Sequence, residues 1–252
     1  PHPTIMVLNG PDEEDLRAIL SADLTPVINS LDQLSRWLAV APDGERKLVL
    51  HLDTGMARLG LQSVDMGEAR ELIGAGPVAM VMSHLACPDA PSNPMNARQL
   101  AVFRDLAKLF PGAAKSLSAT AGAYLGPAFC FDMLRPGIGL YGGGPPPPAT
   151  VTIAPVVTLR APILSIMHAQ AGDTCGYGAT WTSDRPRRLA TLAIGYADGY
   201  LRTLSNRGFG ILNGVRCPLV GRVSMDLISL DVSAAQDDAI PGAMIELIGP
   251  HA

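Results

Sequence analysis

Residues 141–150 read YGGGPPPPAT, and no regular element of secondary structure can run through them. Three glycines are followed by four prolines. Proline has no backbone N–H and a fixed φ, so this stretch can continue neither a helix nor a central strand. We therefore place a domain boundary here, which gives a first domain at residues 1–143 and a second domain at residues 144–252.

Before this boundary, short apolar stretches alternate with segments of helical period, the pattern of βα units that feed a parallel sheet. Strands are expected at 4–8, 25–29, 47–53, 78–86 and 115–120, and the clearest amphipathic helix at 96–110. An eight-unit barrel takes about 30 residues per unit, so this span holds too few units for a closed barrel. The first domain is either an incomplete barrel or an open sheet.

Beyond the boundary, the helical period disappears. Short strand-like stretches recur there between turn signals such as AGD at 171–173 and NG at 213–214. The second domain is therefore expected to be mostly β.

Composition narrows the classes of partner. The 252 residues are 48% hydrophobic and 17% charged, with a net charge of −4, so a large core can form and nothing favours nucleic acid or an anionic membrane. No apolar run is long enough to span a membrane, and no motif indicates a metal site. The cysteines are widely spread, which favours reduced thiols in a cytoplasmic protein: Cys87, Cys130, Cys175 and Cys217.

Several polar residues fall at or just past the carboxyl ends of the expected parallel strands, where ligands bind in α/β folds. They are Arg58, His84, Thr120 and Arg135. Each alone is as readily a structural residue, but together they suit a pocket. Backbone N–H groups near Gly137 and Ile138, with the Thr120 hydroxyl, suit a phosphate group.

Seven motifs, taken in order, resemble those of the alanine racemase family: HLDTGMARLGL, SHLACPDAP, SLSATAG, FDMLRPGIGLYG, GDTCGYGATW, AIGYADGY and CPLVGRVSMD. The family consists of pyridoxal-phosphate enzymes with an N-terminal α/β barrel and a C-terminal β domain. The resemblance implies a TIM-like α/β barrel, incomplete at its N-terminus in this chain, followed by a mostly β domain. It also implies pyridoxal 5'-phosphate as the cofactor.

The resemblance implies roles for residues of the first domain. Arg58 matches the arginine that contacts the cofactor's phenolic oxygen and the substrate carboxylate. Arg135 matches the arginine that faces the pyridine nitrogen. His84 is expected among the cofactor-binding residues, beside the catalytic tyrosine. The phosphate is expected to bind at Thr120, Gly137 and Ile138.

Racemisation needs two acid/base groups on opposite faces of the cofactor. In the family, one is the lysine that binds the cofactor and the other is a tyrosine supplied by the partner subunit of a homodimer. Tyr177 matches this tyrosine, so it is expected to enter the partner's site. Met225 matches a residue whose backbone N–H contacts the substrate carboxylate, and Tyr196 matches a residue that narrows the entrance.

Three departures from the family pattern matter. The cofactor lysine is expected upstream of the region where this chain begins, because Lys47, Lys108 and Lys115 do not match its motif. The family's closing segment, with a further tyrosine, is expected beyond residue 252. His51 stands where many members have a lysine, often carbamylated, that orients the arginine matching Arg58, and Ala119 replaces an asparagine.

The expected function is the interconversion of L-alanine and D-alanine, which supplies D-alanine for cell-wall peptidoglycan. Without the lysine segment, this chain alone is expected to be inactive. Two alternatives stay open: a related serine or broad-specificity amino-acid racemase, and a non-catalytic remnant that binds pyridoxal phosphate or dimerises.

Overall fold

A computed structural model describes residues 4–41 and 47–251. The chain divides into two units, Pro1–Ile153 and Ala154–Ala252, so the division follows the glycine and proline run rather than falling within it. Within the described residues, no helix combines the length and apolar character needed to cross a membrane. The two units are described separately below.

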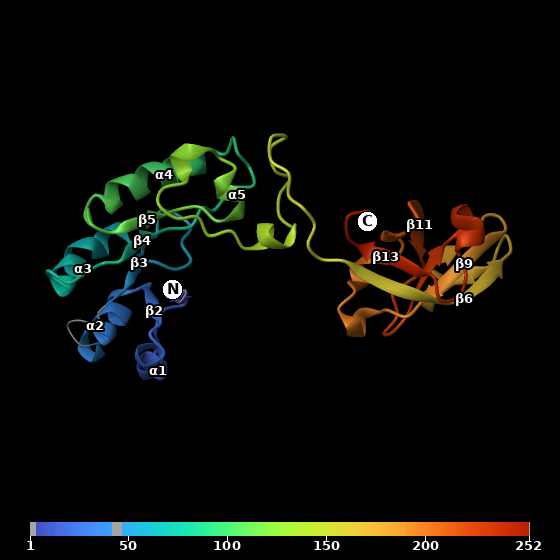
Figure 1. The fold of residues 1–252 in the computed structure, drawn as a ribbon, viewed down its shortest axis with the longest axis horizontal. Helices are drawn as coiled ribbons and strands as arrows, with labels where there is room; N and C mark the ends of the chain where they lie inside the picture. The colour runs from blue at the N-terminus through green and yellow to red at the C-terminus, as the bar shows by residue number, and fades with distance from the viewer. Residues whose placement is uncertain (1–3, 42–46, 252) are drawn as a thin grey trace. The chain divides into compact units, whose positions relative to one another are not determined.

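The first unit alternates strands and helices along the chain (Figure 1). Its strands are β1 (Met6–Val7), β2 (Thr25–Ile28), β3 (Val49–His51), β4 (Met80–Met82) and β5 (Ala114–Ser116). Its α-helices are α1 (Leu16–Ser21), α2 (Leu31–Val40), α3 (Met66–Ile73), α4 (Pro94–Ala107) and α5 (Thr120–Ala123). The strands form one parallel sheet in the order β1-β2-β3-β4-β5, as the βα pattern predicts.

The two faces of the sheet belong to different apolar clusters, because side chains alternate between the faces along each strand. Ile28, Leu50 and Val81 point to the face that the helices cover, and they are fully buried with Trp37 and Phe103. Burying side chains of this size contributes roughly 1.5–3 kcal/mol each. This helix-facing cluster therefore holds α2, α3 and α4 against the sheet.

The opposite face of the sheet carries a second apolar cluster of Val27, Val49, Met80 and Met82. The register pairs Val27 with Val49, and Val49 with Met80. We call this the inner face. Every second residue farther along each strand lies on this same face, up to the edge where the carboxyl ends of the strands lie.

The starts of two helices follow from their sequences. Ser30 caps α2 by accepting a hydrogen bond from the Gln33 N–H. The Gln33 side chain in turn accepts a hydrogen bond through Oε1 from the Asn29 N–H at 2.8 Å, one residue before the cap. Asn93 caps α4, and Pro94 occupies its first turn. This helix therefore begins and ends earlier than the expected 96–110.

The second unit is built on an antiparallel β-barrel with the strand order β10-β11-β12-β9-β6-β13 (Figure 1). Its strands are β6 (Leu159–Ala169), β9 (Arg187–Leu192), β10 (Phe209–Leu212), β11 (Val215–Val220), β12 (Ile228–Asp231) and β13 (Met244–Ile248). A separate hairpin consists of β7 (Thr174–Cys175) and β8 (Trp181–Thr182). The barrel interior is apolar, with Ile163, Leu192 and Ile228 almost fully buried. This architecture agrees with the expected β domain.

Candidate active site

The inner face of the parallel sheet changes from apolar to polar at its carboxyl-end edge. Val27 is followed two residues later by Asn29, and Val49 by His51. Because Val27 pairs with Val49, the same parallel register places Asn29 beside His51. Ser116 ends β5 on this face, opposite Met82. Polar side chains from separate strands therefore meet at one edge.

His51 is only 7% exposed, and its Nδ1 lies 2.7 Å from Asn29 Oδ1. The Asn29 amide nitrogen donates to the carbonyl oxygens of Val27 and Leu8, at 3.0 and 3.2 Å, so its oxygen is the atom that faces His51. His51 Nδ1 is then the donor, and Nε2 carries the lone pair in the neutral ring.

His51 stands where many members of the family that the chain resembles have a lysine, so its charge state decides how it acts on Arg58. Burial lowers the pKa of His51 to about 4, helped by the positive charges of Arg135, His84 and Arg58, while Asp53 acts in the opposite direction. The ring is therefore neutral near pH 7. It is an uncharged hydrogen-bonding group, not an added cation and not an anionic partner for Arg58.

The loop that carries Arg58 is organised by the carboxylate of Asp53. Asp53 Oδ1 accepts hydrogen bonds from the backbone N–H groups of residues 55, 56 and 57 at 2.9, 3.0 and 3.1 Å. Ala57 adopts a left-handed φ of 53°, an unfavourable conformation for alanine that these bonds help to hold. Arg58 follows directly and is exposed at the edge of the site.

The two ends of this loop are joined by backbone hydrogen bonds. The Leu61 N–H donates to the His51 carbonyl at 2.8 Å, and the Asp53 N–H donates to the Leu61 carbonyl at 2.9 Å. Gly60 has a φ of 115°, and a Cβ on it would lie 2.8 Å from the Asp53 backbone nitrogen. Only glycine fits there, which explains the Arg-Leu-Gly sequence of the motif.

Arg135 crosses the same edge from the segment that follows β5. Its backbone N–H donates to the Ser118 carbonyl at 3.0 Å. Its guanidinium donates to Ser116 Oγ and to the Ser83 carbonyl, both at 2.5 Å. Burial lowers the pKa of Arg135 to about 10, which still leaves it cationic near pH 7. Arg135 is thus a fixed positive charge held by neutral acceptors.

His84 completes a group of basic side chains, which we call the basic cluster: Arg58, Arg135, His51 and His84. Burial lowers the pKa of His84, and the charges of Arg135 and Arg58 lower it further. The charges of the two arginines thus disfavour protonation of both imidazoles, so the site combines positive potential with neutral histidines near pH 7. Such an edge is complementary to an anionic ligand.

Thr120 lies next along this edge, at the start of α5. Its Oγ1 accepts hydrogen bonds from the Gly137 N–H at 3.1 Å and the Gly139 N–H at 3.2 Å. Because the oxygen accepts from two amides, the hydroxyl proton is left to donate to an oxygen of an anionic ligand. A Cβ on Gly139 would lie 2.6 Å from Thr120 Cγ2, so glycine is required for this approach.

The arrangement around Thr120 differs from the expected one in one respect. The Gly137 N–H is directed to the threonine hydroxyl in this structure, although the sequence indicated it as a direct phosphate donor. Ile138 follows it, with an exposed side chain. The segment 137–139 therefore orients Thr120 and forms one wall beside it.

In the second unit, Tyr177 lies between Gly176 and Gly178, which have φ values of 73° and 74°. The Tyr177 side chain is 71% exposed. A Cβ on Gly178 would lie 3.3 Å from the Arg222 guanidinium, so the tyrosine loop packs closely on the segment that leads to Met225. Two positive-φ glycines thus present the phenol on a tight, exposed turn.

Tyr196 and Met225 lie on loops that are bonded to each other. The Ala197 N–H donates to the Met225 carbonyl at 2.9 Å, and the Tyr196 N–H donates to the Ser224 carbonyl at 3.0 Å. Both side chains are exposed, Tyr196 by 48% and Met225 by 55%. The second unit therefore holds Tyr177, Tyr196 and Met225 on neighbouring, mutually packed loops.

Sequence reasoning missed four polar residues of the first unit: Asn29, Asp53, Ser83 and Ser116. Asn29 lies two residues after Val27 and therefore on the same face, which is a signal that could have indicated it. Ser116 could have been indicated by its place at the end of a strand. Ser83 acts through its backbone carbonyl, which no side-chain pattern reveals. Asp53 is part of the motif HLDTGMARLGL, but the motif alone does not show that its carboxylate organises the loop.

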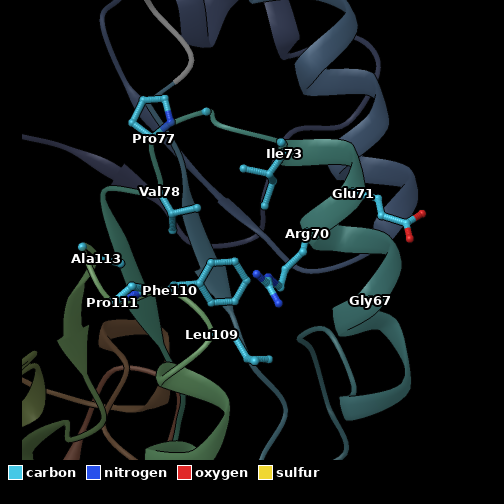
Figure 2. Close-up of a pocket in the computed structure, with 13 residues that line it drawn as sticks. Gly67, Arg70, Glu71, Ile73, Pro77, Val78, Leu109, Phe110, Pro111 and Ala113 are labelled. Atoms are coloured by element: carbon cyan, nitrogen blue, oxygen red, sulfur yellow. The ribbon is translucent and has the colours of Figure 1, made fainter.

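A cavity of about 680 Å³ lies elsewhere in the first unit, between the ends of α3 and α4 (Figure 2). Val78 and Ala113, which line it, precede β4 and β5, so the cavity is at the amino ends of the strands. Figure 2 shows the Arg70 guanidinium directed towards the Phe110 ring. Active sites of α/β sheets form at the opposite, carboxyl ends, so we do not assign the chemistry to this cavity.

The fold and the edge together define a class: an α/β domain with a basic cluster at the carboxyl ends of its parallel strands, followed in the chain by a β-barrel unit. The alanine racemase N-terminal domain family matches residues 1–145, and the alanine racemase C-terminal domain family matches residues 156–252. The chain belongs to the alanine racemase family, as its motifs predict.

Individual relatives agree with this assignment. The chain is 45% identical to the alanine racemase of Rhodospirillum rubrum, over 98% of the chain and 67% of that protein. It is 46% identical to an alanine racemase of Cereibacter sphaeroides, over 99% of the chain and 68% of that protein. Its fold matches a crystal structure of alanine racemase from Bartonella henselae with covalently bound pyridoxal phosphate. That match has a TM-score of 0.90 and 32% identity, and covers 98% of this chain and 70% of the other.

Proposed function

We propose that the protein is an alanine racemase, a pyridoxal-phosphate-dependent isomerase that interconverts L-alanine and D-alanine. The observation that carries the proposal is the basic cluster at the carboxyl-end edge, with the Thr120 hydroxyl beside it, in a chain of this family. The cluster suits the anionic groups of both the cofactor and an amino acid substrate. No observation of the structure favours a serine or broad-specificity racemase, or a non-catalytic remnant, over this proposal.

The residues present fit pyridoxal phosphate on three points. The Thr120 hydroxyl has a proton free to donate to a phosphate oxygen, because its own oxygen already accepts from two amides. Gly137 and Ile138 belong to the same phosphate-binding wall. Gly139 has no side chain, so the space beside Thr120 that a Cβ would occupy stays open. When bound, the cofactor accepts electron density from the broken bond between the α-carbon and its hydrogen.

Arg135 faces the ring nitrogen of the cofactor in this proposal. Its pKa of about 10 means that it donates a hydrogen bond to the nitrogen but does not surrender its proton near pH 7. Its hydrogen bonds to Ser116 and Ser83 fix its direction in advance. Arg135 therefore binds and orients the ring without protonating it.

Arg58 binds the substrate carboxylate and the phenolic oxygen of the cofactor. An exposed guanidinium at the end of a tightly bonded loop can reach such a ligand, and its fork matches a carboxylate. His84, with its lowered pKa, is a neutral imidazole near pH 7 and can accept a hydrogen bond beside these groups.

Tyr177 supplies one of the two acid/base groups, taking or returning the α-proton on one face of the substrate. We propose that it acts in the site of the partner subunit of a homodimer. Its 71% exposure and its tight glycine turn support this role, since they leave the phenol open to a second copy. Met225 binds the carboxylate through its backbone N–H, and Tyr196 narrows the entrance to a size that suits alanine.

The proposal extends to location and product. The cysteines of the described residues are free thiols, which supports a cytoplasmic location. The D-alanine formed supplies cell-wall peptidoglycan in this proposal.

The test is an assay of the full-length protein with pyridoxal phosphate on L-alanine and on L-serine, with chiral separation of the products. The proposal expects D-alanine formation with a kcat/KM at least tenfold above that for serine. Equal or greater turnover of serine would favour the broader racemase. Binding of the cofactor with turnover of neither amino acid would favour the non-catalytic remnant.

A further inference from the structure

Gln99 is a fully buried polar side chain of α4, with 0% of its surface exposed. Its Oε1 accepts a hydrogen bond from the Ala86 N–H at 2.8 Å. Its Nε2 donates to the His84 carbonyl at 2.9 Å and to Thr54 Oγ1 at 3.1 Å. Both amide protons are thus used, and the amide carbonyl has a partner.

These partners belong to two different segments of the candidate active site. Thr54 lies in the loop that carries Arg58, and its hydroxyl also lies 2.8 Å from Ser83 Oγ. His84 and Ala86 belong to the segment that follows β4. The Gln99 side chain is therefore a bridge from the helix layer to both segments, and it fixes the distance between them.

Other residue types cannot replace this bridge. An ionised glutamate would place a carboxylate oxygen against the His84 carbonyl oxygen, and methionine would leave the Ala86 N–H and the His84 carbonyl without this partner. A buried group without its hydrogen bond is costly, so the backbone around His84 would move to recover one. Such a movement would reach the imidazole of His84 on one side and the Arg58 loop on the other.

We infer that Gln99 is a positioning residue of the active site, which sets the spacing of His84 and the Arg58 loop by binding both with one amide. The inference rests on the proposed function for its catalytic consequence. Its structural consequence can be measured without cofactor or turnover.

The test replaces Gln99 by methionine, which is similar in size and lacks the hydrogen bonds, and follows the His84 imidazole by ¹⁵N NMR in the cofactor-free protein. The titration of His84 should move upwards towards the ordinary histidine value, because the Arg58 loop and the half-buried position of the ring are no longer held. His84 faces Arg135, Arg58 and His51, and of these Arg135 and His51 are held by contacts that do not involve Gln99. In the full-length protein with pyridoxal phosphate, kcat/KM for alanine should fall by roughly 10- to 100-fold, the effect of a small misplacement of binding groups.

Phe103→Leu is the matched control, because Phe103 is buried on the same helix and touches neither segment through a hydrogen bond. It should lower Tm and leave both the His84 titration and kcat/KM near those of the unchanged protein. Gln99→Glu is the second variant if the methionine variant does not fold. It keeps the acceptor for Ala86 and, when protonated, one donor, so its effect should be intermediate.

The inference is overturned if the Gln99 variants behave like Phe103→Leu, with lower Tm but an unchanged His84 titration and unchanged kcat/KM. Failure of the proposed function gives a different result. The unchanged protein would then not racemise alanine, while the His84 titration would still decide the role of Gln99.

Discussion

The Nδ1 atom of His51 lies 2.7 Å from Oδ1 of Asn29, in a buried pair on neighbouring parallel strands. Asn29 is itself held by two backbone carbonyls and by the N-terminal turn of α2 through Gln33. The pair therefore sets both the tautomer and the direction of the imidazole. It places a neutral ring in the basic cluster, where another cation would repel Arg58 and Arg135.

The stability of the protein should depend on pH through His51. The pKa of His51 is about 4 in the folded protein against an ordinary value of 6.5, so between these values the unfolded chain binds a proton that the folded protein does not. Stability is therefore fully present above pH 6.5 and is lost as the pH falls towards 4. At 1.36 kcal/mol per pKa unit, the loss is roughly 3 kcal/mol. Urea unfolding at several pH values measures it.

Asn29→Asp is the variant that separates His51 from other acid-sensitive groups. A carboxylate beside Nδ1 stabilises the charged imidazole and raises its folded pKa, typically by about 1–3 units. The part of the acid loss due to His51 should shrink accordingly. An NMR titration that finds His51 unchanged near its low value in this variant would contradict the assigned contact.

Asp53→Ala should loosen the loop that presents Arg58. The substitution removes the acceptor of three backbone N–H groups. The unfavourable φ of Ala57 then loses the hydrogen bonds that help to hold it. Loss of such bonds should cost about 1–3 kcal/mol of stability. The KM for alanine should rise by about tenfold, since about 1.4 kcal/mol of substrate binding is lost with the preformed loop. Steady-state kinetics and urea unfolding measure the two effects.

Asp65→Ala is the control for this prediction. Asp65 also accepts a backbone N–H, from Gln62 at 2.7 Å, but it caps a short helical turn outside the site. It should lower stability without raising KM. The same KM for the two variants would show that Asp53 does not act through Arg58.

Thr120→Val should weaken pyridoxal phosphate binding, whereas Thr120→Ser should largely preserve it. Valine keeps the shape but removes both the acceptor for the amides of Gly137 and Gly139 and the proton left for a phosphate oxygen. A hydrogen bond to a charged group contributes about 1.5–3 kcal/mol, so Kd should rise by roughly 10- to 100-fold. Fluorescence titration with the cofactor measures this. Equal affinity of the two variants would remove Thr120 from the phosphate site.

The three lysines should not carry the cofactor. Lys115 lies between the inner-face residues Ala114 and Ser116, so it points to the opposite face of the sheet, and its Nζ contacts the Ala113 carbonyl at 3.3 Å. Lys108 pairs with Asp105, and both side chains are exposed at the end of α4; Lys47 precedes β3 at the amino end of the sheet. Borohydride reduction with pyridoxal phosphate, followed by peptide mapping, should find no labelled lysine among them. A specific adduct on one of them, together with turnover, would contradict this.

Much of the fold could be predicted from sequence because its signals are local. Apolar stretches of strand length, helical periods and the glycine and proline run indicated a parallel sheet and a β domain. The positions of Arg58, His84, Thr120 and Arg135 at strand ends followed from the same pattern. Helix ends were less accurate: α4 begins at Pro94 because Asn93 caps it, although the apolar period starts later.

The remaining features of the site depend on pairings that no local pattern contains. The contact of Asn29 with His51 needs the register of two strands that are far apart in sequence. The bond from Gln33 to the Asn29 N–H rather than to Ser30 depends on how the chain enters α2. The role of Gln99 needs the packing of α4 against two loops. In each case, tertiary structure selects a partner from several that the sequence allows.

The most direct test of the central claim is to incubate the full-length protein with pyridoxal phosphate and L-alanine in deuterium oxide and follow both chirality and the α-hydrogen. Enantiomers have equal free energy, so the mixture should converge on equal amounts of L- and D-alanine, with deuterium at the α-carbon, from either starting enantiomer. Tyr177→Phe should slow the approach by roughly 10²–10⁴-fold, the usual contribution of a general acid/base. Bound cofactor with no D-alanine and no α-deuterium would contradict the assignment.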